Sequence, residues 1–211
     1  MRLSPRLFLA SALAVGLLAG GAVVAQDALT RNPAEVRAGA YQLDPSHGKI
    51  TWSVSHMGFS TYRGQFTQVS ARLTLDPANP SAGALTATVP MAGVAPNDDA
   101  LKAHLLTADF FDAERFPTAE FRSTSIVVDP SDPTKAAVTG DLTLHGVTKP
   151  VTLAVKFNQA GPFMNAGYRA GFDAETTIIR SEFGIDKYAP VLGDEVTLHI
   201  EGEFVTAPAA N

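Results

Sequence analysis

Residues 138–157 read VTGDLTLHGVTKPVTLAVKF and contain two runs in which apolar and polar residues alternate. The apolar positions are Val138, Gly140, Leu142, Leu144, Val151, Leu153, Val155 and Phe157. Alternation with a period of two is typical of a β-strand with one buried face. The connection Gly146-Val147-Thr148 is too short for a parallel crossover, so the stretch predicts an antiparallel β-hairpin with one apolar face.

Six further alternating runs lie on either side of this hairpin. They span residues 50–56, 69–75, 85–91, 121–127, 168–178 and 196–204. Gly58 and Gly64 predict a turn after the first of them. Pro90 cannot donate to a strand ladder and predicts an end, a bulge or an edge in the third.

Eight such runs with mostly short connections predict an all-β antiparallel meander. The length of the runs and their single polar face favour closure into an eight-stranded barrel, because a closed barrel has no free sheet edge. A two-sheet sandwich is the alternative. An eight-stranded barrel is just wide enough either to be filled by side chains or to hold one slender ligand.

One helix is expected in this chain of strands. Pro96-Asn97-Asp98-Asp99 offers an Asn or Asp cap and acidic residues for the positive end of a helix. Leu101, His104, Leu105 and Ala108 then recur at helical spacing. Residues 27–40, in contrast, are polar and lack a clear period, which predicts a loose arm with one helical turn.

The first 25 residues have the layout of a secretory signal peptide. Arg2 and Arg6 precede the uncharged apolar run 7–25, which ends in Val23-Val24-Ala25. We expect cleavage after Ala25 and a periplasmic protein; a retained membrane anchor is the alternative. The expected layout is a signal peptide (1–25), an arm (26–40), a barrel domain (41–206) and a tail (207–211).

Composition excludes several classes of function. The chain has no cysteine, so disulfides, thiol nucleophiles and Cys-type zinc sites are absent. With 16 Lys+Arg against 21 Asp+Glu and no basic stripe, nucleic-acid binding is not expected. Neither an HExxH nor a GxSxG motif is present, and we expect no catalysis, no metal and no cofactor.

Several segments resemble the YceI-like family in order and spacing, over about residues 41–206. They are 44–47 (DPSH), 52–58 (WSVSHMG), 105–112 (LLTADFFD), 116–121 (FPTAEF), 140–150 (GDLTLHGVTKP) and 180–184 (RSEFG). One departure is Ser55, which precedes His56 where the family often carries Arg or Lys. The resemblance implies an extended lipocalin-like barrel with the helix near one mouth. It also implies a secreted bacterial protein that binds a polyisoprenoid or another long-chain lipid inside the barrel.

On this basis we predict a set of ligand-contacting residues. They are Trp52, Val54, His56, Phe66, Leu85, Val89, Leu105, Phe110, Phe121, Leu142, Phe172, Arg180 and Phe183. His56 shares a face with Ile50 and Trp52 and is expected to point inward, towards a headgroup or a structural partner. Arg180 is expected either to hold an anionic headgroup or to form an ion pair. The candidate partners for that ion pair are Glu182, Asp109 and Asp112.

The small residues on the apolar faces carry two interpretations. Ala71, Ala87, Gly140, Ala170 and Ala174 either leave room for a lipid chain or accommodate large neighbours across the barrel. We therefore predict non-catalytic binding, storage or transport of a polyprenyl or related lipid, with transient membrane contact and a homodimer as further options. The alternatives are a redox or stress-response accessory that uses a quinone, haem or metal near the histidines, and a barrel packed solid.

Overall fold

The strands form one antiparallel sheet that closes on itself. A computed structural model describes residues 28–163 and 167–206. The strands are β1 (Gly39–His56), β2 (Ser60–Phe66), β3 (Ser70–Leu75), β4 (Ala84–Pro90), β5 (Val94–Ala95), β6 (Thr118–Asp129), β7 (Asp132–Leu144), β8 (Val147–Pro162), β9 (Tyr168–Ile179) and β10 (Leu192–Thr206). The helical segments are α1 (Asp99–Leu105) and the 3-10 turns η1 (Pro33–Glu35), η2 (Pro80–Ala82), η3 (Met91–Gly93) and η4 (Arg180–Phe183).

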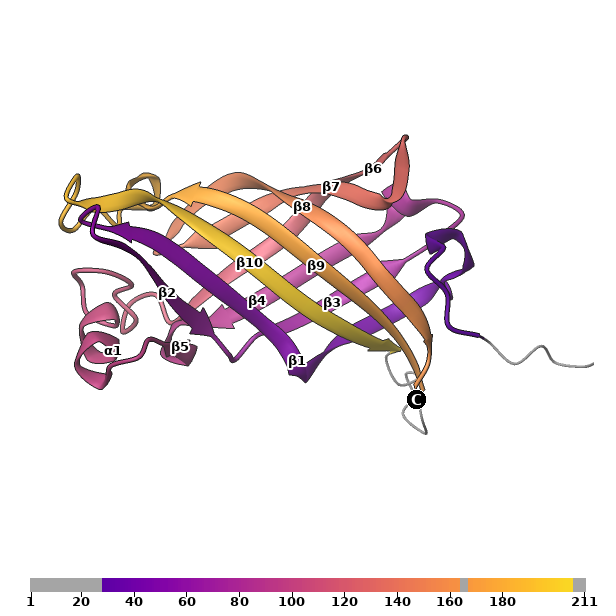
Figure 1. Ribbon diagram of the computed structural model, residues 1–211, viewed down its shortest axis with the longest axis horizontal. Helices are drawn as coiled ribbons and strands as arrows, with labels where there is room; N and C mark the ends of the chain where they lie inside the picture. Colours follow the sequence, from indigo (N-terminus) through magenta and orange to yellow (C-terminus); the bar gives the residue numbers. More distant parts are fainter. Residues whose placement is uncertain (1–27, 164–166, 207–211) are drawn as a thin grey trace, which may run out of the picture.

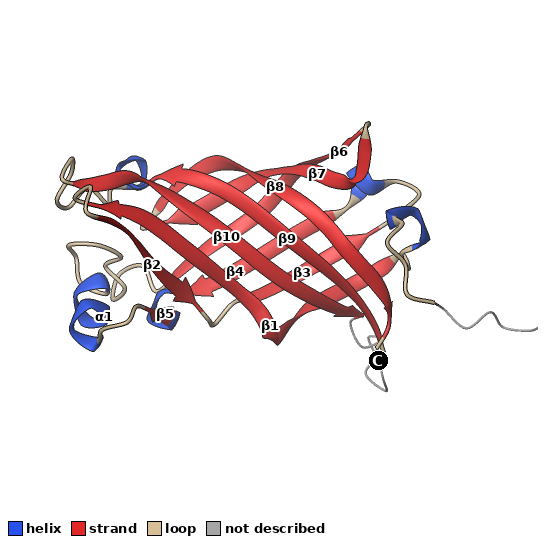
Figure 2. Ribbon diagram, viewed as in Figure 1, coloured by secondary structure: helices blue, strands red, loops and turns tan. Residues whose placement is uncertain are grey.

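Pairing between the first and the last long strand closes the barrel. Each strand pairs with its neighbour in the order β1, β3, β4, β6, β7, β8, β9, β10. The last strand, β10, then pairs with β1 from Tyr41↔Thr206 to His56↔Leu192 and so closes the circle. The prediction of a closed eight-stranded antiparallel barrel is confirmed, and the sandwich is excluded. Figure 2 shows the long tilted strands wrapping one shared axis.

The strand β2 was not predicted, and it corrects the turn assigned to Gly58 and Gly64. The reversal takes place at Met57 and Gly58, which both have positive φ, and β2 follows at once. Gly64 lies inside β2, opposite Trp52. A Cβ atom at Gly64 would lie 2.3 Å from Cζ2 of Trp52, so this glycine makes room for the indole ring and does not mark a turn.

The β2 and β3 segments together form one wall of the barrel. The first residues of β1, Gly39–Gln42, pair with β3, and its last residues, Ile50–His56, pair with β2. The two-residue β5 then pairs with the end of β2. Strand β4 ends at Pro90, one of the positions expected for a residue without a backbone donor.

The helix α1 covers one end of the barrel (Figure 1). Its N-cap is Asp98, whose side chain accepts a hydrogen bond from the Leu101 amide at 2.7 Å, as the sequence predicted. The helix ends at Leu105, before Ala108, and the chain then turns through Phe110 and Phe111.

The N-terminal arm lies at the opposite end of the barrel (Figure 1) and is not loose. It contains the predicted helical turn, η1, capped by the side chain of Asn32. Thr30 pairs with Ala160 of β8, and Val36 is buried against the barrel interior. The arm packs because Val36 supplies an apolar side chain to the core at this end and Thr30 adds a backbone pairing.

The predicted signal peptide (1–25) and C-terminal tail (207–211) lie outside the described residues. Within the described ranges, no helix combines the length and the apolar character that a membrane crossing requires.

Candidate ligand-binding site

The barrel interior holds two apolar cavities. The first, of about 370 Å³, lies towards the N-terminal arm and is called here the arm-end cavity. The second, of about 690 Å³, lies towards α1 and is called the helix-end cavity. Volumes in this range are typical of small-molecule sites. The interior is therefore not packed solid.

The arm-end cavity is lined by the inward faces of strands from both sides of the barrel. Pro33, Ala34 and Val36 of the arm form its floor. Its apolar wall includes Leu43, Val69, Leu73, Leu85, Phe121, Val138, Leu153, Val155, Phe157, Phe172, Ile200 and Phe204. These residues occupy alternate positions along their strands, because successive side chains of a strand point to opposite faces.

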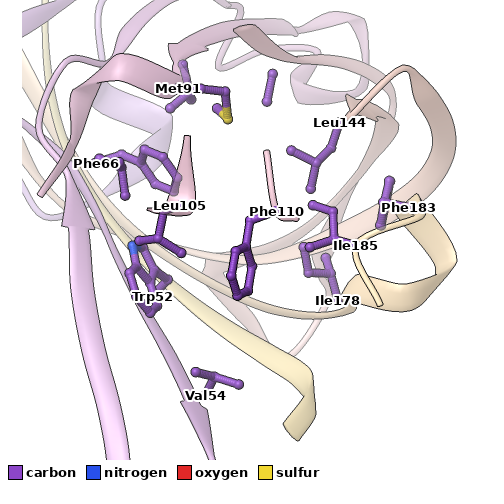
Figure 3. Close-up of a cluster of buried hydrophobic side chains, with 13 residues drawn as sticks. Trp52, Val54, Phe66, Met91, Leu105, Phe110, Leu144, Ile178, Phe183 and Ile185 are labelled. Carbon is purple, nitrogen blue, oxygen red and sulfur yellow. The ribbon is translucent and has the colours of Figure 1, made fainter. Parts of the chain in front are cut away.

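The helix-end cavity lies beneath α1 and the loops around it. Its wall includes Trp52, Val54, Phe66, Met91, Leu105, Phe110, Leu144, Ile178 and Ile185, whose side chains face a common space in Figure 3. Leu105 comes from α1 and Phe110 from the segment that follows it, whereas the strand residues come from β1, β2, β7 and β9. The helical segment thus supplies part of the wall of this cavity.

The two cavities share five lining residues. They are Ile50, Val89, Ala119, Leu142 and Leu198, which we call the waist. Because both cavities touch the same five side chains, the cavities are neighbours along the barrel axis, on either side of the waist. A chain long enough to occupy both would pass the waist.

The small residues on the apolar faces divide between the two interpretations. Ala71, Ala87 and Ala174 line the arm-end cavity and leave space there. Gly140 instead accommodates a large neighbour, since a Cβ atom at this position would lie 2.5 Å from Cζ of Phe121. Ala170 is fully buried in the cluster around Tyr41 and Phe157 and lines neither cavity.

Twelve of the thirteen residues predicted to contact a ligand line one of the cavities. Trp52, Val54, His56, Phe66, Leu105, Phe110 and Arg180 line the helix-end cavity; Leu85, Phe121 and Phe172 line the arm-end cavity; Val89 and Leu142 belong to the waist. Phe183 is the exception. Its ring is 2% exposed and belongs to the packed core, and its carbonyl accepts a hydrogen bond from Nδ1 of His145 at 3.0 Å.

His56 does not point into a buried interior, as the alternation had suggested. It is exposed at the end of β1, where it lines the edge of the helix-end cavity next to the ring of Tyr62. The reason is its position: His56 is the last residue of β1, so the strand does not continue beyond it and the imidazole lies at the rim of the barrel. His56 is therefore a mouth residue.

Arg180 has a role that the sequence did not suggest. Its side chain is only 5% exposed, and it forms none of the expected ion pairs with Glu182, Asp109 or Asp112. It donates instead to backbone carbonyls at 2.8–3.0 Å. The acceptors are the carbonyls of Gly193, Ile185, Lys187 and Leu192.

These four bonds tie the loop between η4 and β10 to the end of β9. Burial lowers the pKa of Arg180, and the nearby carboxylates of Asp194 and Asp186 partly oppose that effect. Four of the five guanidinium N–H groups are satisfied by the loop and by the first two residues of β10, so the main contribution of Arg180 in this structure is to shape the mouth. A contact between its remaining donor and a ligand stays a prediction.

Trp52 contributes a buried donor as well as an apolar surface. Its ring stacks on Tyr62 with ring centroids 5.7 Å apart, and Gly64 allows this approach. Within the described part of the chain, no group accepts a hydrogen bond from its buried Nε1–H. An unsatisfied buried donor is unfavourable by about 1–3 kcal/mol, so packing holds the indole in this position.

A small network bridges the mouth of the helix-end cavity. Lys187 Nζ lies 3.0 Å from Asp109 Oδ1, and His104 Nε2 lies 3.0 Å from Asp109 Oδ2. Hydrogen bonds from His104 and Lys187 lower the pKa of the Asp109 carboxyl. The ring of Tyr188 lies 6.2 Å from those of His104 and Phe110. The loop before β10, which carries Lys187 and Tyr188, is therefore held against the segment that follows α1, which carries Asp109 and Phe110.

The residues of this mouth were largely missed by sequence reasoning. Tyr62 shares an alternating face with Gly64 and Phe66, and this pattern was a usable signal for β2. Tyr188 and Val191 lie in an irregular loop without periodicity, so only the tertiary structure could place them at the cavity.

The histidines lie apart and have separate partners. His47 bonds to Asp44, His145 to the Phe183 carbonyl, and His199 to Glu175 on the outer surface. In the ranges that the structure describes, no three residues of the His, Asp or Glu type are grouped as a metal site would require.

Comparisons with known proteins agree with this architecture. The family model of the YceI-like domain matches residues 41–204. A UPF0312 protein of Pseudomonas putida is 37% identical over 180 residues, which cover 84% of this chain and 86% of the relative.

Solved structures agree as well. The crystal structure of Burkholderia cenocepacia BcnA superposes with a TM-score of 0.68 at 28% identity and covers 76% of this chain and 98% of its own. A polyisoprenoid-binding domain from Saccharophagus degradans has a TM-score of 0.59 at 12% identity, covering 81% of this chain and 100% of its own, a likeness of fold.

Proposed function

The chain belongs to the YceI-like family, and from this premise we propose that it binds one long-chain lipid, a polyisoprenoid or a related molecule, inside the barrel. The observation that carries the proposal is the pair of apolar cavities that meet at the waist. They offer an apolar environment along the barrel axis, which suits a long and slender apolar chain better than a compact ligand.

The length of the barrel supports a long chain. Strand β10 has 15 residues. At ~3.3 Å per residue and a tilt of ~40°, such a strand spans roughly 35–40 Å along the axis. Each buried methylene contributes about 0.8 kcal/mol before the cost of association, so several isoprene units supply ample affinity.

The polar groups of the site suit a headgroup at the helix-end mouth. His56 lies exposed at this edge of the cavity, and its ring nitrogens can donate to a headgroup oxygen or accept from a hydroxyl. The arm-end cavity is lined at its end by the apolar arm residues Pro33, Ala34 and Val36, which favours the chain terminus there. The proposed pose has the tail at the arm end and the head near α1.

We further propose that binding takes place in the periplasm and without catalysis. The support for the location is the signal-peptide pattern in residues 1–25. The support for binding without catalysis is the chemistry of the cavity walls, which are dominated by aliphatic and aromatic side chains. No described wall residue forms a nucleophile–base pair of the kind that acyl transfer needs.

Native mass spectrometry of the protein purified from a periplasmic extract tests this proposal. We expect a bound species with the mass of a long-chain lipid, released by organic solvent. The chain has a single tryptophan, Trp52, which lines the helix-end cavity, so its fluorescence should change when a polyprenol is added to delipidated protein. Protein without any lipid mass and without a fluorescence response would refute the proposal, whereas a haem absorption band would support the redox alternative.

A further inference from the structure

The exposed apolar side chains of the barrel are concentrated at one mouth. Met57, Phe59, Tyr188 and Val191 are 51%, 86%, 53% and 59% exposed. Among the described residues, only Leu29, Val127 and Phe163 are further large apolar side chains with comparable exposure, and they belong to the arm, to β6 and to the end of β8. Single exposed apolar residues are normal on a protein surface, but a group of four is not.

The four residues come from two neighbouring loops at the end of the barrel, which we call the tips. Met57 and Phe59 lie in the turn between β1 and β2, directly after His56. Tyr188 and Val191 lie in the loop that leads into Leu192, and Leu192 pairs with His56. This pairing places the two tips side by side, and Figure 1 shows them projecting beyond the barrel at the same end as α1.

These tips continue directly into the helix-end cavity. Met57, Tyr188 and Val191 all line that cavity as well as being exposed, whereas Phe59 points away from it. An apolar path therefore leads from the outer surface, over the rim, into the barrel. A lipid that enters here never has to expose its whole chain to water.

The tips also carry no formal charge. Residues 57–62 (MGFSTY) and 188–193 (YAPVLG) contain no Asp, Glu, Lys or Arg. Arg63, which is exposed, stands directly outside the first segment, where its long cationic side chain can reach lipid phosphates while the tips lie deeper; Lys187, directly before the second segment, is paired with Asp109. Aromatic residues such as Phe59 and Tyr188 are also well suited to the boundary between headgroups and acyl chains.

From this arrangement we propose that Met57, Phe59, Tyr188 and Val191 form a bilayer-docking rim through which lipid passes between a membrane and the helix-end cavity. The proposal rests on the lipid-binding function proposed above. It selects a membrane as the partner because a bilayer would both cover the uncharged apolar tips and be the source of the ligand.

Vesicle flotation of the full-length mature protein tests the rim. The probes are phosphatidylcholine vesicles with and without phosphatidylglycerol. We expect the unmodified protein to float with the vesicles. The double variant Phe59→Ser/Val191→Ser should lose this association by at least about tenfold, because its apolar surface no longer leaves water. Val127→Ser is the matched control: its side chain is 60% exposed but lies near the end of β6, between Ile126 and Val128, which line the arm-end cavity.

A second measurement separates this proposal from lipid binding itself. Phe59 does not line the cavity, so Phe59→Ser should bind a detergent-solubilised polyprenol with unchanged affinity, followed by Trp52 fluorescence, while its transfer of lipid between vesicles slows. Flotation that the double variant retains, or an unmodified protein that does not float, would overturn the docking rim. A concentration-dependent dimer that the double variant abolishes would also overturn it, since the rim would then be a self-association surface. Flotation without polyprenol binding would refute only the proposed function.

Discussion

The waist between the two cavities provides the sharpest test of how the barrel holds a chain. Ala119 of β6 is 8% exposed, pairs with Val89 of β4, and lines both cavities. Replacing it by phenylalanine places an aromatic ring between the two cavities. We expect Ala119→Phe to restrict a ligand to the helix-end cavity, because the tail can no longer pass into the arm-end cavity.

The size of the effect follows from the carbon atoms that remain in water. Each methylene that cannot be buried forfeits about 0.8 kcal/mol, which is about fourfold in the dissociation constant. A single excluded isoprene unit of five carbons therefore weakens binding by up to about 4 kcal/mol, or roughly a thousandfold. Short ligands that fit within the helix-end cavity should bind as before.

The assay is a series of polyprenols of increasing length, titrated into delipidated protein and followed by the fluorescence of Trp52. The unmodified protein should gain affinity with each added unit, whereas Ala119→Phe should reach a plateau. Ala137→Phe is the control, because Ala137 is exposed on β7. Overpacking destabilises by about 1–3 kcal/mol, so urea unfolding must show that the variant is folded. Equal length dependence in folded Ala119→Phe and in the unmodified protein would refute the chain path through the waist.

Three further predictions concern stability. Gly64→Ala should destabilise the fold by about 1–3 kcal/mol and shift the fluorescence emission of Trp52, because the added Cβ would lie 2.3 Å from the indole ring of Trp52. Unchanged emission and an unchanged free energy of unfolding would contradict this packing. Arg180→Met should lower the free energy of unfolding by about 3–5 kcal/mol, because the buried carbonyls lose their donor. The control Arg63→Met, at an exposed position, should change it little. Equal effects of the two variants in chemical unfolding would rule out the loop-shaping role of Arg180. Burial raises the pKa of Tyr41 to about 12 from 10.0, so the unfolded state loses this proton first and the free energy of unfolding should fall by up to about 2 kcal/mol as pH rises from about 10 to 12. Urea unfolding of Tyr41→Phe should lack this slope, and a slope that persists would assign it to another group.

Local chemistry made part of the site predictable. Alternation placed Trp52 and Val54 on the inward face of β1, and both line the helix-end cavity. The acidic cap at Asp98 placed the start of α1 correctly. These features depend on neighbours within a few residues, which the sequence displays directly.

Other parts depended on contacts between distant segments. Alternation alone could not show that β1 ends at His56 and leaves the imidazole exposed. Arg180 is satisfied by carbonyls of the irregular loop that follows η4 and of the first residues of β10, as far along the chain as Gly193. The arm looked loose because its polar residues dominate, yet it is held at the end of the barrel by the buried side chain of Val36 and by the pairing of Thr30 with Ala160.

The sequence by itself determined the apolar face of the long strands and, through eight alternating runs, predicted a closed antiparallel barrel. Only the tertiary structure decided whether this barrel has room for a ligand. Gly140 and Ala87 are both small inward residues, but Phe121 fills the space at the first, while the second lines a cavity. The physical reason is that the direction of a side chain, inward or outward, is set within one strand. The free volume inside the barrel depends instead on which side chains meet across it.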